Sequence, residues 1–186
     1  MTPVESKRFV ISDRDGTIIV HEPYLPDPDK VKLLPGVVDG LRKLKELGLG
    51  LVMVTNQSAI GRGLFDESRL ALIHDRLNQL LIAEGIRLDG IYYCPHKPED
   101  ACNCRKPRVG MVLSASLSFG FDPSNCFFIG DNECDIELGQ NVGATTFLTR
   151  TGYGIEVETK GVVQPDYVVD NILQAAQIIK SIIQGT

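Results

Sequence analysis

The sequence has no long hydrophobic run and no excess of basic residues. Its longest nearly apolar stretch, residues 47–54, is far shorter than the roughly 20 residues that a membrane-spanning helix needs. The N-terminal segment MTPVESKRFV lacks the charged-then-apolar pattern of a signal peptide. With 19 Lys and Arg against 24 Asp and Glu, the net charge of −5 disfavours a nucleic-acid partner. We therefore expect a cytoplasmic protein that binds neither membranes nor nucleic acids.

Cysteine is scarce and unevenly placed. The chain has five cysteines, and an odd number without an export signal argues against a disulfide framework. Three of them share the segment CPHKPEDACNC with a histidine, which matches a structural Zn²⁺ site, although the spacings are tighter than in most zinc fingers. Buried free thiols or a disulfide are the alternatives. The predicted zinc ligands are Cys94, His96, Cys102 and Cys104. The remaining two, Cys126 in the core and Cys134, are predicted to be structural.

Strand-like apolar runs alternate with helical patterns along the chain. The expected strands are residues 8–12, 50–55, 90–94, 126–130, 145–148 and 166–169. The expected helices are residues 37–47, 66–84 (with Asp66 as N-cap), 109–119, 135–142 and 171–183. This alternation predicts an α/β fold with a central parallel sheet covered by helices on both faces. Because no repeat or long linker divides the chain, we expect one domain of residues 1–186, with residues 21–34 as a surface loop.

Two carboxylates follow the first expected strand in the segment VISDRDGTIIV. Asp13 and Asp15 should lie at the carboxyl edge of the sheet, where open parallel sheets bind ligands. Two carboxylates so close together indicate a hard cation such as Mg²⁺. They also suggest that one acts as a nucleophile and the other as a proton donor and acceptor. The alternative is a turn in which the aspartates only bind their own backbone.

Polar side chains also follow later strands. Thr55 and Asn56, in VTNQS, offer neutral donors to a phosphoryl group, although a polar helix cap would explain them equally well. Lys106, in CRKP, could neutralise a phosphate and Arg105 could bind an anion through two hydrogen bonds; a solvated basic pair is the alternative.

A further acidic segment, GDNECD, follows the expected strand at residues 126–130. Asp131 should project toward the same edge as Asp13, and Asp135 could cap the following helix and support the site. Carboxylates at two strand ends, with a lysine and a threonine at two others, form a set suited to a phosphate and a cation.

The ordered segments DRDGT, VTNQS, RKP and GDNECD resemble the four motifs of the haloacid dehalogenase (HAD) superfamily of Mg²⁺-dependent phosphohydrolases. The resemblance runs from residue 9 to about residue 154 and implies a three-layer Rossmann-like fold. It also implies that Asp13 attacks phosphorus, that Asp15 is the general acid and base, and that Thr55 and Lys106 stabilise the phosphoryl group. The implied Mg²⁺ ligands are Asp13, the backbone carbonyl of Asp15, and Asp131.

The cysteine-rich loop directly before RKP resembles that of the heptose bisphosphate phosphatases and histidinol-phosphate phosphatases within the superfamily. The resemblance implies that zinc orders the loop carrying Arg105. The implied substrate-binding residues are His21, Glu22, Tyr24, Asn56, Gln57, Ser58 and Arg105. Asn132 departs from the lysine or arginine expected after Asp131. His74, inside an amphipathic pattern, is interpreted as a helix-surface or packing residue.

The spacing of the motifs leaves no room for a cap domain. Only 41 residues separate Asp13 from Thr55 and 50 separate Thr55 from Lys106, and the expected elements fill both gaps. We expect an open site in a monomer, acting on a small phosphorylated sugar. By resemblance, the reaction is removal of the 7-phosphate of a heptose 1,7-bisphosphate. The alternatives are histidinol-phosphate phosphatase, another small phosphomonoesterase and a non-catalytic scaffold that binds phosphorylated ligands.

Overall fold

A six-stranded parallel sheet forms the centre of the computed structural model, which describes residues 7–185. The strands are β1 (Phe9–Ser12), β2 (Gly50–Asn56), β3 (Gly90–Cys94), β4 (Phe127–Gly130), β5 (Thr145–Thr149) and β6 (Tyr167–Val169). Their order is β3-β2-β1-β4-β5-β6, and every neighbouring pair is parallel. The predicted α/β fold is therefore confirmed, and no expected strand boundary is wrong by more than one residue.

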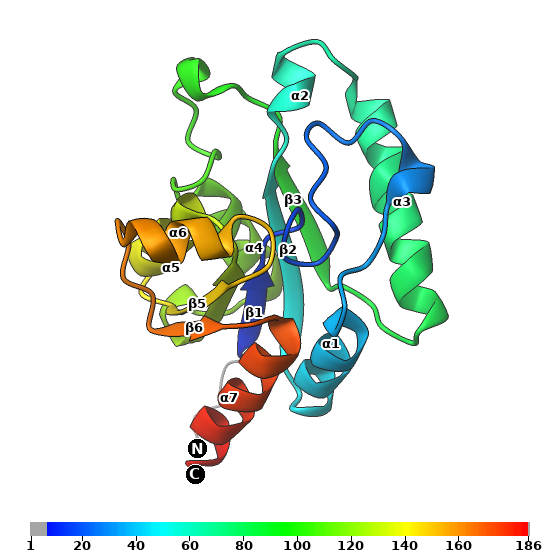
Figure 1. The fold of residues 1–186 in the computed structure, drawn as a ribbon. Coiled ribbons are helices and arrows are strands. Elements are labelled where there is room, and N and C mark those ends of the chain that lie inside the picture. Colours follow the sequence, from blue (N-terminus) through cyan, green and yellow to red (C-terminus); the bar gives the residue numbers. More distant parts are fainter. Residues whose placement is uncertain (1–6, 186) are drawn as a thin grey trace.

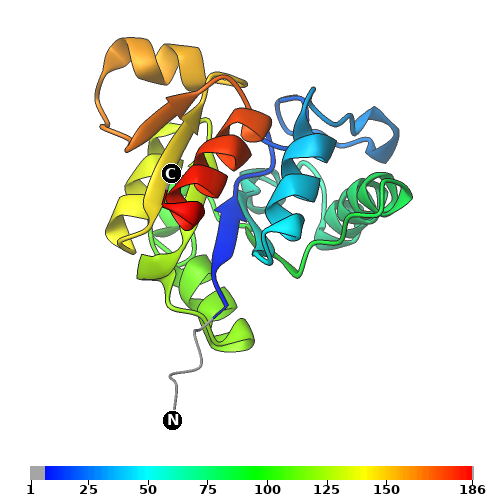
Figure 2. The same cartoon turned by 90° about the horizontal axis from the view of Figure 1, so that it is seen from below.

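Helices cover both faces of the sheet (Figures 1 and 2). One face carries α1 (Val37–Glu46), α3 (Glu67–Ala83) and α7 (Ile172–Gln184); the other carries α4 (Gly110–Phe119), α5 (Glu133–Asn141) and α6 (Gly154–Lys160). The expected N-cap is confirmed, because the side chain of Asp66 accepts a hydrogen bond from the amide of Arg69. The sequence did not predict α6 or the single turn of α2 (Ser58–Gly61), since both are too short for a helical period to stand out.

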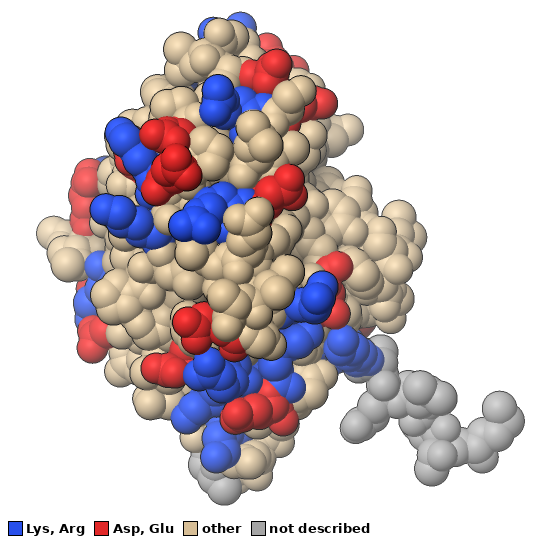
Figure 3. Space-filling view, turned by 90° about the vertical axis from the view of Figure 1, so that its right-hand side faces the viewer, with Lys and Arg blue, Asp and Glu red and all other residues tan. Residues whose placement is uncertain are grey.

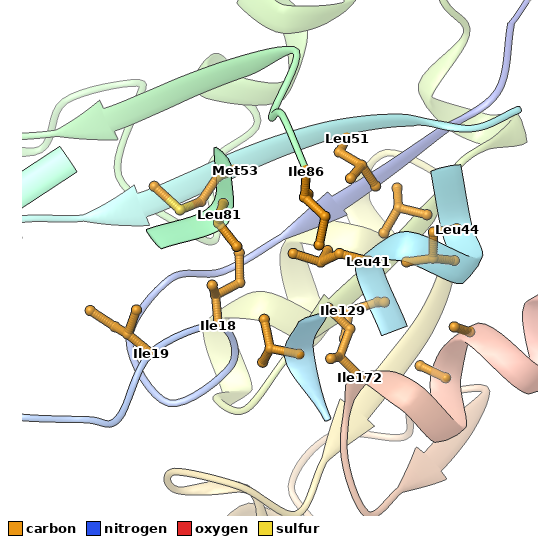
Figure 4. Packing of buried hydrophobic residues seen from close by; sticks show 14 of the residues in the cluster. Ile18, Ile19, Leu41, Leu44, Leu51, Met53, Leu81, Ile86, Ile129 and Ile172 are labelled. Carbon is orange, nitrogen blue, oxygen red and sulfur yellow. The ribbon is translucent and has the colours of Figure 1, made fainter. Parts of the chain in front are cut away.

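The alternation of side chains along the strands divides the core into two layers. In β1, Val10 packs into the layer under α1, α3 and α7, whereas Phe9 and Ile11 pack into the layer under α4. Figure 4 shows the first layer, in which Leu41 of α1 and Ile172 of α7 approach the sheet. Truncating a fully buried leucine such as Leu41 to alanine costs about 2–5 kcal/mol, so this layer fixes the sheet that carries the site.

The segment between β1 and α1 lies at the carboxyl edge of the sheet, as an irregular loop with a short 3-10 helix, η1 (Pro28–Lys30). It is more firmly anchored than a plain surface loop, because Leu25 and Val31 are buried and Ile19 forms an isolated bridge with Leu33. In Figure 1 the arrow of β1 points toward the edge where α2 follows β2. The residues after β1, β2 and β4 thus meet at one edge.

No cap domain interrupts this edge within residues 7–185. The β1–β2 connection contains η1 and α1, and the β2–β3 connection contains α2 and α3. The β3–α4 connection holds the cysteine-rich loop with a second 3-10 helix, η2 (Pro98–Asp100), and a third, η3 (Pro123–Asn125), precedes β4. The capless arrangement expected from the motif spacing is therefore confirmed for the described residues.

Basic and acidic side chains are interspersed on the face shown in Figure 3. Ion pairs on the protein surface include Arg42 with Asp39 at 3.0 Å and Lys45 with Asp89 at 3.1 Å. None of the helices in the described part of the chain is long and apolar enough to cross a membrane.

Candidate active site

A cavity of about 410 Å³ opens at the carboxyl edge of the sheet. Every residue predicted to act in catalysis, substrate binding or Mg²⁺ binding lines it. These residues are Asp13, Asp15, His21, Glu22, Tyr24, Thr55, Asn56, Gln57, Ser58, Arg105, Lys106 and Asp131. Arg14 and Tyr153, for which the sequence indicated no role, line it as well. The volume suits a small ligand, since pockets for such molecules measure about 300–1,000 Å³.

Lys106 contacts three oxygen atoms on the floor of the cavity. Its Nζ donates to Oδ1 of Asp13 at 2.5 Å, to Oδ1 of Asp135 at 2.7 Å and to the carbonyl oxygen of Val54 at 3.2 Å. Burial disfavours the charged form of Lys106, but the carboxylates of Asp13 and Asp135 outweigh it and raise the pKa of the lysine. Lys106 is therefore a permanent positive charge in the site.

Three buried carboxylates surround this lysine, at the end of β1 (Asp13), at the end of β4 (Asp131) and in the first turn of α5 (Asp135). One oxygen of each lies within 4.8 Å of the others. Burial raises the pKa of Asp13 to about 7 and that of Asp131 to about 8, and repulsion from neighbouring carboxylates adds to both shifts. Crowded carboxylate oxygens of this kind fit a hard divalent cation such as Mg²⁺.

Asp135 holds the cluster together. Its Oδ2 accepts hydrogen bonds from the backbone amides of Asp131 at 3.2 Å and Asn132 at 3.0 Å, while Oδ1 accepts from the lysine. Because α5 begins two residues earlier than expected, Asn132 is its N-cap and Asp135 caps it from within the first turn. Asp135 therefore links the lysine to the backbone that carries Asp131.

Two glycines make room for the carboxylate of Asp131. Gly16 and Gly152 have φ values of 86° and 54°, and a Cβ atom would lie 2.3 Å and 2.0 Å, respectively, from Oδ2 of Asp131. The hydroxyl of Thr17 donates to Oδ1 at 3.3 Å, and the backbone amide of Tyr153 donates to Oδ2 at 2.9 Å. Asp131 is thus fixed by the loops that follow β1 and β5.

Asp15 occupies a separate position beside this cluster. Its carboxylate accepts hydrogen bonds from Arg14, through Nε at 3.1 Å and Nη2 at 3.0 Å. Gln57 donates to Oδ2 of Asp15 at 2.9 Å and to the hydroxyl of Thr55 at 2.8 Å. Gln57 is buried at the wall of the cavity, where its amide holds both Asp15 and Thr55. The side chain of Asp15 is 19% exposed and faces the cavity.

The end of β2 holds the backbone that carries the lysine. Asn56 accepts a hydrogen bond from the amide of Lys106 at 3.0 Å and donates one to its carbonyl oxygen at 3.3 Å. The guanidinium of Arg105 donates to the carbonyl oxygen of His96 at 3.2 Å. These three hydrogen bonds link the end of β2, the lysine and the cysteine-rich loop.

The four predicted zinc ligands lie together directly before Arg105. The Sγ atom of Cys104 is 3.2 Å from that of Cys94 and 3.5 Å from that of Cys102, and Nδ1 of His96 is 3.2 Å from Cys104. All five cysteines of the chain are free thiols. A tetrahedral site with Zn–S bonds of about 2.3 Å needs sulfurs about 3.7 Å apart, so the donor set fits Zn²⁺.

Aromatic and charged residues form the rim of the cavity. The hydroxyl of Tyr153 lies 3.0 Å from Nε2 of His21, and the two rings meet edge to face with centroids 4.6 Å apart. Glu22 pairs with Lys30 at 2.9 Å. Tyr24 is half exposed and has a φ of 52°, a strained value for a residue with a side chain.

Comparisons with known proteins agree with this geometry. A family model described as HAD-hydrolase-like matches residues 103–175. The D-glycero-beta-D-manno-heptose-1,7-bisphosphate 7-phosphatase of Haemophilus influenzae is 38% identical over 182 residues, covering 93% of this chain and 97% of that protein. The enzyme of that name from Escherichia coli strain K12 is 38% identical over 180 residues, covering 92% and 93%. The chain belongs to the heptose-1,7-bisphosphate phosphatase family.

Solved structures of this family have the same fold. The crystal structure of D,D-heptose 1,7-bisphosphate phosphatase from B. bronchiseptica, complexed with magnesium and phosphate, matches with a TM-score of 0.87 at 30% identity, covering 96% of this chain and 99% of that one. The enzyme from Burkholderia thailandensis matches with a TM-score of 0.74 at 30% identity, covering 94% and 99%. The expected HAD fold is therefore confirmed.

Sequence reasoning missed two residues of this heptose bisphosphate phosphatase site. Arg14 is buried. Its position between the two predicted catalytic aspartates was the available signal, because a charged side chain that is buried there needs a partner. Tyr153 contributes a backbone amide and a hydroxyl from the segment TGYG after β5. No side chain in that segment signals a role in the sequence. Its place at the site becomes visible only in the folded structure.

Proposed function

We propose that this chain is a Mg²⁺-dependent phosphohydrolase that removes the 7-phosphate of D-glycero-D-manno-heptose 1,7-bisphosphate. The observation that carries the proposal is the contact of Lys106 with Asp13 beside Asp131, inside a cavity large enough for a sugar phosphate. The curated relatives named for this reaction share nearly the whole length of the chain, which supports the choice of substrate.

In the proposed reaction Asp13 attacks the phosphorus atom. A carboxylate oxygen of Asp13 forms the new P–O bond while the bond to the sugar oxygen breaks, which gives an aspartyl phosphate. Lys106, 2.5 Å from Asp13, offsets the negative charge on the phosphoryl oxygens, and Thr55 donates a hydrogen bond to them. Asp15 gives its proton to the departing sugar oxygen.

The aspartyl phosphate is then hydrolysed. Asp15, now a carboxylate, takes a proton from water, whose oxygen attacks phosphorus, and the bond to Asp13 breaks to release inorganic phosphate. Asp13, the backbone carbonyl of Asp15, and Asp131 would hold Mg²⁺. When bound, the ion supplies positive charge that lowers the repulsion between the carboxylate and the phosphate.

We propose that the rim selects the sugar. His21, Glu22 and Tyr24 come from the loop after β1, and Ser58 begins α2. Arg105 would bind the part of the substrate that does not react, as a guanidinium suits a second phosphate. Zn²⁺ on the four Cys and His ligands would hold the loop that carries Arg105, because this loop has few apolar residues of its own.

We further propose that the chain, expected to be one domain of residues 1–186 and described by the structure for residues 7–185, acts as a single domain and as a monomer in the cytoplasm. The apolar face of α7 supports the monomer, because Ile172, Ala176 and Ile179 pack into the core. Five cysteines without a disulfide are typical of a reducing compartment. Light scattering of the purified protein tests the oligomeric state.

The test is phosphate release in the presence of Mg²⁺ from heptose 1,7-bisphosphate and from histidinol phosphate, with Asp13→Asn as the blank. We expect the heptose bisphosphate to be cleaved at least about 100 times more efficiently. Preferential cleavage of histidinol phosphate would overturn the substrate but keep the chemistry. Release that does not exceed the Asp13→Asn blank with any phosphomonoester would overturn the proposed reaction.

A further inference from the structure

Arg14 is a buried cation between Asp15 and His74. It is 1% exposed, and its Nε and Nη2 donate to the two carboxylate oxygens of Asp15. Its third donor group, Nη1, lies 3.1 Å from Nε2 of His74. A guanidinium has only donors and stays charged in proteins, so each partner must accept. The orientation of Arg14 therefore depends on two acceptors, one on each side.

His74 supplies the acceptor on the side away from the cavity. It lies on the apolar face of α3, between Leu70 and Leu77, and is 8% exposed. Because Arg14 donates to Nε2, the ring must be neutral, with its proton on Nδ1. Burial, with the charge of Arg14 as a second cause, lowers the pKa of His74 to about 3. The ring thus remains an acceptor near neutral pH.

Asp15 is held from the opposite side as well. Gln57 donates to its Oδ2 at 2.9 Å, so the carboxylate lies between an amide and the guanidinium. Arg14, Gln57 and His74 are each more than nine-tenths buried, whereas the side chain of Asp15 is 19% exposed toward the cavity. Buried groups of this kind set the direction in which an exposed functional group points.

We propose that His74 is a positioning residue for the reaction: by accepting from Arg14 it holds the guanidinium that orients the carboxyl group of Asp15 toward the leaving oxygen. This inference rests on the role of Asp15 in the proposed function. A misplacement of about 1 Å at a reacting group lowers rates about 100-fold, so a residue outside the cavity can control proton transfer. Neither the motifs nor the cavity lining includes His74.

The consequence depends on the leaving group. A sugar leaves as an alkoxide, which needs the proton of Asp15, whereas p-nitrophenolate is stable without one. Loss of the acceptor at residue 74 should therefore slow the first step with a sugar phosphate and spare the first step with p-nitrophenyl phosphate. A residue that only packs in the core would affect both substrates alike.

The experiment compares His74→Leu, which removes the acceptor, with His74→Gln, which keeps an oxygen acceptor. Single-turnover release of the leaving group is measured with saturating Mg²⁺ for the heptose bisphosphate and for p-nitrophenyl phosphate. We expect His74→Leu to slow release of the sugar about 10-fold or more. The same variant should slow release of p-nitrophenolate less than about threefold. His74→Gln should release the sugar at nearly the wild-type rate. Tyr93→Leu is the control for packing, because Tyr93 meets the His74 ring edge to face at 6.0 Å between centroids.

Equal slowing of both substrates by His74→Leu, or no slowing of either, would overturn the role of His74 while the proposed function stands. If the wild type releases neither leaving group above the Asp13→Asn blank, the proposed function fails, and this inference fails with it. Circular dichroism checks that each variant folds. If His74→Leu does not fold, His74→Asn replaces it, since its shorter side chain withdraws the acceptor from Arg14 and predicts the same selective loss.

Discussion

The ammonium nitrogen of Lys106 lies 2.5 Å from Oδ1 of Asp13, and both side chains are more than nine-tenths buried. An ion pair at this depth gains little net stability, because desolvation of both charges offsets their attraction. Its place in the fold is better explained by the proposed chemistry. The lysine comes from the loop after β3 and the aspartate from the end of β1, so the pair depends on the packing of β1, β2 and β3 side by side.

Replacing Lys106 with methionine should remove both activity and stability. The change leaves the buried carboxylates of Asp13 and Asp135 without their cation, which costs about 3–5 kcal/mol of unfolding free energy. The rate of phosphate release should fall at least about 100-fold, as when one charge-stabilising donor is lost. Urea unfolding and a phosphate assay with Mg²⁺ measure the two effects. Lys160→Met, which breaks an exposed pair with Glu156, is the control and should change neither.

Binding of Mg²⁺ should tighten as the pH rises from about 6 to 8. Burial raises the pKa of Asp13 to about 7 and that of Asp131 to about 8. Above about pH 4 the unfolded chain has released these protons, whereas the metal-free folded chain still holds them. Its unfolding free energy therefore falls as the pH rises from about 4 to 8. Since Mg²⁺ must displace these protons, the increase in Tm that it causes should be larger at pH 8 than at pH 6. Two results would contradict this expectation. One is an equal Mg²⁺-induced increase in Tm at both pH values, and the other is an undiminished increase in the Asp131→Asn variant.

His74 should make the protein less stable in mild acid. Its pKa in the folded chain is about 3, against about 6.5 in an unfolded chain, mainly because the ring is buried. Between these values the unfolded chain binds a proton that the folded chain does not, so the unfolding free energy falls as the pH falls below about 6.5. From pH 6.5 to 5 the loss reaches up to about 2 kcal/mol. Urea titrations of the wild type and His74→Gln at each pH isolate this contribution, which the variant should lack.

Removal of the predicted zinc should act on the reaction through Arg105 and Lys106. Cys102→Ser should lower the zinc content measured by atomic emission from about one equivalent to near zero. The rate at saturating Mg²⁺ should fall about 10-fold or more, because Arg105 is tied to the loop through the carbonyl of His96. Cys126→Ala, in a buried cysteine outside the cluster, should keep the zinc and most of the activity. A zinc-free Cys102→Ser protein with full activity would show that the loop needs no metal.

The fold could be predicted because its signals are local and agree with one another. Each strand is an apolar run and each long helix shows an apolar stripe, so the parallel sheet follows from their alternation. The start of α5 was placed two residues late because Asn132 and Asp135 are both good capping residues. The single turn of α2 and the short α6 contain too few residues for a period to be recognised.

The candidate site was predictable where chemistry follows a strand end in sequence. Asp13, Thr55 and Asp131 are of this kind, and the structure brings them to one cavity. The contact of Arg14 with His74 joins residues 60 positions apart, and no local pattern specifies it. Tyr153 is similar, since its contacts with Asp131 and His21 depend on where the β5 loop lies in the finished sheet.

Tyr153 connects the rim of the cavity to Asp131, the proposed Mg²⁺ ligand, and its two contacts can be separated by mutation. Its backbone amide donates to Oδ2 of Asp131, and its hydroxyl meets Nε2 of His21 at 3.0 Å. Tyr153→Phe removes only the hydroxyl, so the support of Asp131 remains. Because His21 then loses a partner that fixes the loop after β1, we expect KM for the heptose bisphosphate to rise about threefold to tenfold, as for one lost hydrogen bond. The value of kcat should stay within about twofold, since no reacting group is moved.

Gly152→Ala tests the other contact of the same loop. A Cβ atom there would lie 2.0 Å from Oδ2 of Asp131 and 2.8 Å from the Cα atom of Gly16, so the loop or the carboxylate must move. The variant should lose kcat by about 10-fold or more and need more Mg²⁺ for half-maximal rate, whereas Tyr153→Phe should leave the Mg²⁺ requirement unchanged. Steady-state kinetics over a range of substrate and Mg²⁺ concentrations separates the two results. If Tyr153→Phe instead lowers kcat and raises the Mg²⁺ requirement, the hydroxyl and the amide act as one unit, and the rim and the metal site are mechanically coupled through Tyr153.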